Sequence, residues 1–309
     1  MLSAISPRKW AARYLPASVK SAIKSGPPGA LVRLTLRMRN DLVTRRLASD
    51  HVFEQPADHS RAAACMSVVV PVHDAPIVTK RCLASLERYG KEAEVIIVDD
   101  ASKLIETTEI IRSFRSRNGW KVVSNPKATG HSKASATGAA LATRPYLCLL
   151  NSDTVTTPWC WLPIQEAFRD HNSIGAVGPS TSRSGTRQAL PVARDCRFDW
   201  NDNQICAFAD RLRNPFRNAL VDLPWIGGFA LFIRRNLWQE LGGFDHTMTD
   251  YGNEIELCKR VRKAGYRTVW ARRAYIHHFA AQSYMQVMPL REIEHLRLAG
   301  ARYARDKHK

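Results

Sequence analysis

The stretch SVVVPV at residues 67–72 decides the fold of this chain. It is a short apolar run without alternation, which is typical of a strand buried on both faces of a sheet. Residues 77–89 follow with apolar side chains at helical spacing, and EVIIV at 94–98 repeats the pattern of a buried strand. A strand, a helix and a strand in this order predict a β-α-β unit and therefore a parallel sheet.

The same alternation continues along most of the chain. We predict the α/β class, with a mostly parallel sheet covered by helices on both faces. A polar segment at 180–187 is expected to be a loop, and the segment that ends at His278 to be extended. Further strands are expected at 121–124, 146–150, 174–177, 229–233 and 266–270. Further helices are expected at 107–115, 132–142, 161–169, 235–241 and 254–264.

The composition bounds the classes of protein that have to be considered. A length of 309 residues allows one large or two ordinary domains. Hydrophobic residues at 45% and charged residues at 24% exclude a wholly disordered chain. The formal net charge of +18 favours anionic partners, namely nucleic acid, acidic lipid or phosphate-bearing small molecules.

The cysteines and the apolar runs indicate the compartment. The seven cysteines are scattered and none forms a CxxC pair, which argues against a metal cluster and against a disulfide framework. No apolar run approaches the roughly 20 residues that span a bilayer, and no signal-peptide pattern opens the sequence. We therefore expect a cytoplasmic protein.

Charge and periodicity divide the chain into three regions: a basic extension at 1–64, a main domain at 65–280 and a basic C-terminal helix within 281–309. The extension carries eleven Lys or Arg against four Asp or Glu, and its leucines between 31 and 47 recur at helical spacing. Three interpretations stay open for it. It forms a helix packed on the main domain, a disordered tail, or a basic amphipathic helix that holds the protein peripherally on the inner face of an anionic membrane.

Polar residues follow two of the predicted strands, at the point where each strand ends. Asp99 and Asp100 end the second strand, and Asn151-Ser152-Asp153 follow the strand at 146–150. Ligands of open parallel sheets bind beyond the carboxyl ends of the strands. A carboxylate there can accept hydrogen bonds from a nucleotide or hold Mg²⁺ or Mn²⁺, although each residue can also cap a turn. We assign Asp99 to a nucleotide and Asp153 to a metal ion.

A third acidic residue, Glu254, follows Gly252 and Asn253. Asn253 is expected to cap the next helix, which puts Glu254 in its first turn, where the helix dipole favours an ionised carboxylate. General-base chemistry on a hydroxyl needs such a carboxylate. Glu256 is expected to face elsewhere, because positions two apart do not share a helix face.

Two adjacent histidines, His277 and His278, end a segment expected to be extended. Neighbouring side chains in a strand point to opposite faces, so at most one of them reaches a site. We choose His277, as a metal ligand or as a hydrogen-bond donor to a diphosphate.

Taken in order, these segments resemble the motifs of family-two glycosyltransferases with a GT-A fold, especially the branch that contains bacterial rhamnosyltransferase-like enzymes. The resemblance covers residues 67–278 and includes Asn125 with Gly130. The motifs that carry it are VVVPVHD at 68–74, VIIVDDAS at 95–102, LLNSDT at 149–154, WIGGFALFIRR at 225–235, LGGFD at 241–245 and NEIELCKRVRKAGYR at 253–267.

The resemblance implies a GT-A type sheet with a nucleotide-binding half and an acceptor-binding half, and it implies roles for single residues. Glu254 takes the position of the catalytic base. Asp153 and His277 take the positions of metal ligands for Mg²⁺ or Mn²⁺. The residues implied for the acceptor are Trp225, Gly227 and Gly228. Those implied for the nucleotide-sugar are Pro71, Val72, Asp99, Asn151, Ser152 and Asp153.

The function that follows is inverting transfer of a sugar from a nucleotide-sugar donor to a hydroxyl of a glycan or lipid-linked glycan, by metal-assisted single displacement. By resemblance, the acceptor belongs to cell-envelope polysaccharide biosynthesis. A sugar-phosphate nucleotidyltransferase would need a glycine-rich phosphate loop after the first strand, where PVHD stands at 71–74. A nucleic-acid partner is not expected, because basic residues do not interleave with aromatic ones. A non-catalytic glycan-binding relative of the fold is the remaining alternative.

Overall fold

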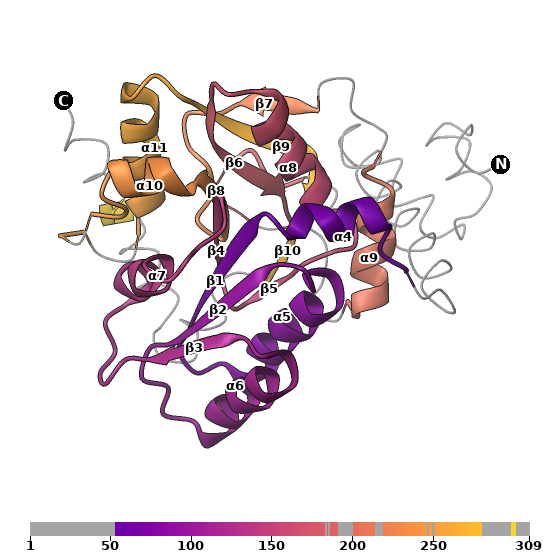
Figure 1. Cartoon of the computed structure of the whole chain (residues 1–309), viewed down its shortest axis with the longest axis vertical. Coiled ribbons are helices and arrows are strands. Elements are labelled where there is room, and N and C mark those ends of the chain that lie inside the picture. Colours follow the sequence, from indigo (N-terminus) through magenta and orange to yellow (C-terminus); the bar gives the residue numbers. More distant parts are fainter. Residues whose placement is uncertain are drawn as a thin grey trace, which may run out of the picture.

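The chain forms an α/β body in the computed structural model (Figure 1). The predicted basic helix between 31 and 47 and nearly all of the predicted C-terminal helix lie outside the described residues. The structure describes residues 53–182, 184, 186–190, 200–213, 219–245, 247–248, 251–279 and 298–300.

The first half of the main domain alternates strands and helices as the sequence predicted. β1 pairs in parallel with both β2 and β4, and β2 pairs in parallel with β3. The elements are β1 (Met66–Val72), α5 (Pro76–Tyr89), β2 (Glu94–Asp99), α6 (Ile105–Asn118), β3 (Lys121–Ser124), α7 (His131–Ala139) and β4 (Tyr146–Leu150).

The second half completes an eight-stranded sheet in the order β3-β2-β1-β4-β8-β6-β9-β7. β8 runs antiparallel to its neighbours β4 and β6, and β7 runs antiparallel to β9. A separate two-stranded ribbon joins β5 and β10. The elements are β5 (Thr154–Val155), α8 (Trp161–Asp170), β6 (Ile174–Ser180), α9 (Asp202–Asp210), β7 (Leu220–Asp222), β8 (Ala230–Arg234), α10 (Arg235–Glu240), α11 (Asn253–Lys263), β9 (Arg267–Tyr275) and β10 (His277–His278).

The predictions did not include α4 (Ala57–Ala63), β5, β7 or α9. The two strands are too short to show a period. α9 does carry a readable signal, because Asn201 and Gln204 form a capping box at its start. α4 lies inside the segment predicted as the extension, and its Ala62 and Ala63 belong to the main core, so the folded body includes the end of that segment.

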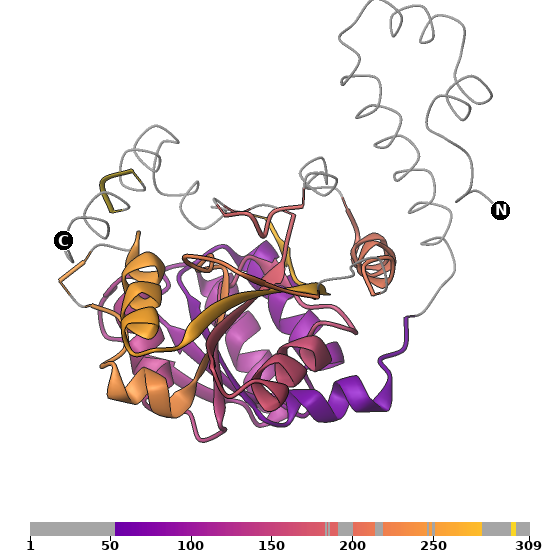
Figure 2. The ribbon, with the colours of Figure 1, turned by 90° about the horizontal axis from the view of Figure 1, so that it is seen from above.

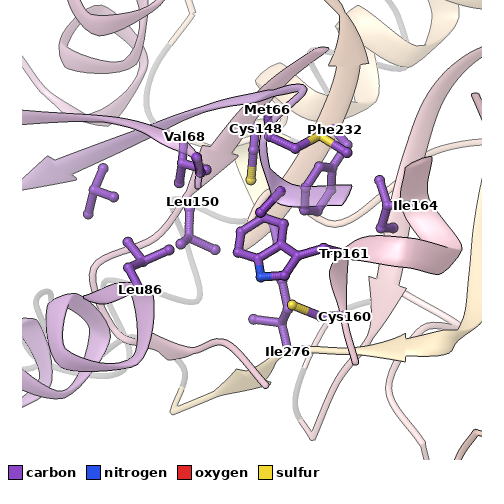
Figure 3. Close-up of a cluster of buried hydrophobic side chains, with 14 of the residues drawn as sticks. Met66, Val68, Leu86, Cys148, Leu150, Cys160, Trp161, Ile164, Phe232 and Ile276 are labelled. Atoms are coloured by element: carbon purple, nitrogen blue, oxygen red, sulfur yellow. The ribbon is translucent and has the colours of Figure 1, made fainter. Parts of the chain in front are cut away.

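Two layers of side chains cover the sheet. On one face, Val68 and Val70 of β1 pack with α5, α6 and α8, and on the other face Val69 packs with α7, α10 and α11. Both faces of β1 are therefore buried, which explains the unbroken apolar run. Figure 3 shows the first layer around Trp161, whose indole Nε1 donates to the carbonyl of Tyr89.

A third apolar cluster lies under α9, and half of its residues are aromatic. Figure 2 shows α4 and α9 at one end of the body and α10 and α11 at the other. α9 is fastened to α5 by Arg81, whose guanidinium donates to Asp202 and to the carbonyl of Trp200. The cluster contains Val155, Trp159, Leu190, Trp200, Ile205, Phe208, Ala209, Leu212, Leu223, Trp270, Tyr275 and Phe279.

Glu94, at the start of β2, gathers hydrogen bonds at the amino-terminal edge of the sheet. It accepts from Ser67 Oγ at 2.5 Å, Lys121 Nζ at 2.6 Å and Thr143 N at 2.8 Å. Partial burial opposes ionisation, but these hydrogen bonds outweigh it and lower the pKa of Glu94 to about 2. The ionised carboxylate therefore stabilises the fold.

Glu94→Gln is expected to lower the free energy of unfolding at pH 7 by about 2 kcal/mol. The folded pKa of Glu94 is depressed, so its contribution is present above 4.5 and is lost as the pH falls from there towards about 2. The wild type should thus lose more stability on acidification than the variant. Urea midpoints at pH 7 and in this acidic range measure the effect, and equal acid sensitivity of the two proteins would contradict it.

Candidate active site

The topology brings the predicted site segments to one edge of the sheet. β1, β2 and β4 are parallel, so Val72, Asp99 and Leu150 end at the same edge. β8 is antiparallel to β4, and its first residue, Ala230, pairs with Leu150. The segment that leads into β8 therefore lies at the same edge. The carboxyl edge of a parallel sheet is the usual place for a ligand.

The two aspartates at the end of β2 have different surroundings. Asp99 is 8% exposed, and its Oδ1 accepts from Ser102 N at 2.9 Å. Asp100 accepts from Asn125 Nδ2 and from the backbone N–H groups of Thr129 and Gly130. Burial opposes ionisation of Asp100, but these donors prevail and lower its pKa. Asp100 therefore fixes the loop before α7, which is the turn role that the sequence left open.

The turn after β1 is held by Asp74. Asp74 Oδ1 accepts from the backbone N–H groups of Lys103 and Leu104, at the start of α6. The backbones of Asp74 and Ala75 are left-handed, with φ of 55° and 57°. The ends of β1 and β2 are joined directly, because Asp100 N donates to Val72 O at 2.8 Å.

Asn151, at the end of β4, contacts both the segment before β8 and the start of α7. Its backbone N–H donates to Phe229 O at 2.9 Å, and its Oδ1 lies 3.0 Å from Nε2 of His131, the first residue of α7. Ser152 beside it is buried. The sequence reasoning missed His131. Its place directly after Gly130, at the start of a helix that follows a parallel strand, was the signal available.

Asp153 lies beside His278, not His277. Thr154 pairs with His278 in the β5-β10 ribbon, and Asp153 Oδ1 lies 3.3 Å from His278 Nε2. Phe279 N also donates to Asp153 O at 3.0 Å. The ribbon therefore sets the two side chains against each other.

His277, the histidine chosen from the sequence, contacts residues of the cluster under α9. Its Nδ1 lies 3.0 Å from the hydroxyl of Tyr275, and its ring stacks on Trp200 in the cluster under α9. The two histidines do face opposite ways, as expected for a strand. The register of β10 on β5 decides which of them meets Asp153, and a single sequence does not contain that register.

The pair of Asp153 and His278 fits a divalent cation. One carboxylate oxygen and one imidazole nitrogen form a mixed donor set, which suits Mn²⁺ better than Mg²⁺, an ion that prefers oxygen ligands. Across the part of the chain that the structure describes, no cluster of three or more His, Cys, Asp or Glu side chains has metal-binding geometry. The remaining coordination positions would therefore fall to water and to phosphate oxygens of a ligand.

Glu254 stands in the first turn of α11, as predicted, but the cap is Gly252. Gly252 has φ of 90°, and Asn253 is the first helical residue rather than the cap. A Cβ built on Gly228 would lie 3.6 Å from Cδ of Glu254, so the carboxyl lies over this glycine. Burial raises the pKa of Glu254, and backbone N–H groups at the helix start offset part of the rise.

Glu256 faces away from Glu254, as expected, and holds α11 in place. Arg260 pairs with it at 2.5 Å and also donates to the carbonyls of Leu241 and Gly243. This ion pair, in which Glu256 is buried and Arg260 partly exposed, thus fastens α11 to the turn that follows α10. The position of Glu254 depends on this attachment.

The two glycines of the segment before β8 have different roles. Gly227 N donates to Oε1 of the buried Gln188 at 2.7 Å, and a Cβ on Gly227 would lie 2.8 Å from Ser184 Oγ. Gly228 leaves room beside the carboxyl of Glu254. Trp225 is half-buried against the core. Gln188, which the sequence reasoning missed, therefore connects the polar segment at 180–187 with the expected acceptor side.

Contacts link Glu254, the expected base, to the pair of Asp153 and His278. Gly228 lies against Glu254, and the ring of the next residue, Phe229, stacks on His278 with centroids 5.2 Å apart. His278 in turn contacts Asp153. The acidic residues are thus gathered at one edge of the sheet, as the proposed chemistry needs.

Within the described residues, no helix combines the length and the apolar character that crossing a bilayer requires.

Comparison with known proteins gives a family match and distant relatives. The description "Glycosyl transferase family 2" matches residues 67–239, more than half of the chain. The inactive polypeptide N-acetylgalactosaminyltransferase-like protein 5 of Macaca fascicularis is 27% identical over 185 residues, which are 56% of this chain and 41% of that protein. The N-acetylglucosaminyl-diphospho-decaprenol L-rhamnosyltransferase of Mycobacterium tuberculosis is 34% identical over 59 residues, 19% of either protein. The chain thus spans well under two thirds of these relatives.

A solved structure supports the fold. The crystal structure of GalNAc-T7 with UDP, GalNAc and Mn²⁺ superposes with a TM-score of 0.56 and 17% sequence identity, over 85% of this chain and 52% of that one. Strand order, helix placement and family match agree with the resemblance that the sequence motifs indicated. The chain therefore belongs to glycosyl transferase family 2 and has the GT-A fold.

Proposed function

We propose that this protein is an inverting glycosyltransferase that moves a sugar from a nucleotide-sugar donor to a hydroxyl of a glycan or lipid-linked glycan. One observation carries the proposal. The partly buried Glu254 and the pair of Asp153 and His278 flank the same two residues, Gly228 and Phe229. A base and a diphosphate site separated by so short a segment suit a displacement between two bound sugars.

The donor would lie along the carboxyl ends of β1, β2 and β4. Pro71, Val72 and Asp99 would receive the nucleotide base, and Asn151 and Ser152 would adjoin the ribose and the diphosphate. The relation to GalNAc-T7, whose structure contains UDP and Mn²⁺, supports a nucleoside diphosphate at this edge.

Asp153 and His278 would hold the divalent cation, Mn²⁺ or Mg²⁺. When bound, such a cation offsets the negative charge that develops on a leaving diphosphate. The mixed donor set and the Mn²⁺ in the GalNAc-T7 structure support manganese.

Glu254 would act as the general base. Its carboxylate takes the proton of the acceptor hydroxyl, whose oxygen forms the new bond to the anomeric carbon. The bond from that carbon to the diphosphate oxygen breaks at the same time, and its electron pair leaves with the diphosphate. A single displacement from the opposite face inverts the anomeric centre. Burial strengthens Glu254 as a base, because it raises the pKa of the carboxyl.

The acceptor would enter beside Trp225, Gly227 and Gly228. The rhamnosyltransferase relative acts, by its name, on a decaprenol-linked sugar, which supports a lipid-linked acceptor of cell-envelope polysaccharide synthesis. A cytoplasmic protein held peripherally on the membrane by the basic segment before residue 53 would meet such an acceptor.

A donor screen tests the proposal. Release of nucleoside diphosphate is measured with a panel of UDP-, GDP- and dTDP-sugars, each with Mn²⁺, Mg²⁺ or EDTA. We expect release with one nucleotide class, stimulated by Mn²⁺ and abolished by EDTA, and an inverted anomeric signal in the NMR spectrum of the product. Nucleotide binding without release for any donor would instead favour a non-catalytic protein, as the inactive macaque relative illustrates by its name.

A further inference from the structure

The contact between His131 and Asn151 has no part in the function proposed above. Nε2 of His131 lies 3.0 Å from Oδ1 of Asn151, and the two residues come from α7 and from the end of β4. Asn151 is two residues before Asp153, at the position where a second carboxylate would complete an Asp-x-Asp pattern. Asn151 directly follows β4, at the carboxyl edge of the sheet.

The backbone of Asn151 is already fixed. Its N–H donates to Phe229 O at 2.9 Å, and its carbonyl accepts from Thr154 Oγ1 at 2.7 Å. What stays adjustable is the orientation of the side-chain amide, which has an oxygen acceptor on one side and an NH₂ donor on the other. A partner that engages only the oxygen determines where the NH₂ group points.

We propose that His131 is a positioning residue: its Nε2–H holds Oδ1 of Asn151, so that the amide Nδ2–H is presented to an oxygen of the nucleotide-sugar. The inference rests on the proposed function for its ligand. It assigns to Asn151 a hydrogen bond to the donor rather than a place among the metal ligands.

Charge explains why an amide suits this position. A diphosphate is strongly negative, and Asp153 contributes one negative charge while His278 contributes none when it is neutral. A second carboxylate at 151 would reduce the positive charge that a divalent cation offers to the diphosphate. An N–H donor adds a favourable contact without that reduction, and hydrogen bonds to charged groups are the stronger ones.

The hydrogen bond itself can be tested without a ligand. Long-range ¹⁵N spectra of the full chain labelled at histidine, with the His131 signal assigned by its loss in His131→Ala, should show the Nε2–H tautomer. An Nδ1–H tautomer would put a lone pair against Asn151, reverse the amide and overturn the proposal.

Calorimetric binding of nucleoside diphosphate tests the consequence. UDP, GDP, CDP and dTDP are each titrated with Mn²⁺ into the wild type, and the tightest is kept as the probe. His131→Ala is expected to weaken its binding about tenfold, the loss of one well-placed hydrogen bond to a charged group. His131→Gln, whose amide N–H can replace Nε2–H, should restore most of it. Lys133→Ala, an exposed residue in the same helical turn, should bind like the wild type.

A double-mutant cycle separates positioning from a general effect on folding. If His131 acts through Asn151, His131→Ala has no further effect in an Asn151→Ala background. Additive losses would overturn the proposal. Asn151→Asp should bind Mn²⁺ alone more tightly but the nucleoside diphosphate more weakly, and tighter binding of both would overturn the hydrogen-bond role.

The proposed function can fail separately. If the wild type binds no nucleoside diphosphate with Mn²⁺, the proposed function is wrong and the donor part of this inference falls with it. The tautomer measurement still decides whether His131 orients Asn151.

Discussion

Replacing Glu254 by glutamine is expected to lower the turnover number for sugar transfer by about 10²–10⁴-fold, the range that general-base catalysis contributes. Glutamine keeps the shape of the side chain beside Gly228 but cannot accept the proton of the acceptor hydroxyl. Donor binding should be unchanged, because the nucleotide side of the site is untouched. Initial rates of nucleoside diphosphate release, together with calorimetric binding, measure the two effects separately.

The matched control is Glu240→Gln, which removes an exposed carboxylate from the neighbouring helix α10 and should leave the rate unchanged. Transfer by Glu254→Gln at a rate close to that of the wild type would remove Glu254 as the base.

The same variant separates catalysis from stability. Burial raises the folded pKa of Glu254 above its ordinary value of 4.5, so the ionised form costs stability, and the cost grows as the pH rises through the folded pKa. Glu254→Gln should therefore melt at the wild-type temperature or above it at pH 7, although it is inactive. For the same reason, kcat/KM of the wild type should fall on acidification with an apparent pKa above 4.5.

Replacing Asp153 by alanine is expected to abolish Mn²⁺-dependent nucleotide binding and to lower kcat/KM by about 10³-fold, since a catalytic cation contributes several kcal/mol to the transition state. Asp153 is the carboxylate beside His278, and alanine leaves the imidazole as the remaining side chain of the pair. Electron paramagnetic resonance of free Mn²⁺ measures metal binding directly, without reference to turnover.

Asp170→Asn serves as the control, because it removes an exposed carboxylate that pairs with Arg169 on the surface. His278→Ala should resemble Asp153→Ala, and His277→Ala should retain Mn²⁺ binding while it loosens the cluster under α9. If His277→Ala lost Mn²⁺ binding and His278→Ala kept it, the assignment of the two histidines would have to be reversed.

Much of the fold could be predicted because a strand that is buried on both faces has a continuous apolar sequence. SVVVPV, EVIIV and YLCLL are nearly continuous apolar runs, and the structure buries all of their residues except Glu94 and Tyr146, which are partly exposed. The segments at 121–124 and 146–150 were predicted with the bounds that β3 and β4 have. α9 was not predicted, although the residues of its capping box, Asn201 and Gln204, can be recognised in the sequence.

The candidate site was predictable where a residue's role follows from its position along one element. Asp99 and Asp153 follow strands, and Glu254 stands in a helix start, so the sequence by itself determined which acidic side chains lie at the carboxyl edge. Contacts between distant segments decided the rest. His278 meets Asp153 through the register of β10 on β5. Gln188 contacts Gly227 from a loop, and His131 contacts Asn151 from the start of α7; no periodicity in the sequence predicts either contact. The local pattern of apolar residues predicts which side chains are buried. Which residues from distant segments contact one another depends on how separate elements pack, and only the tertiary structure decides that.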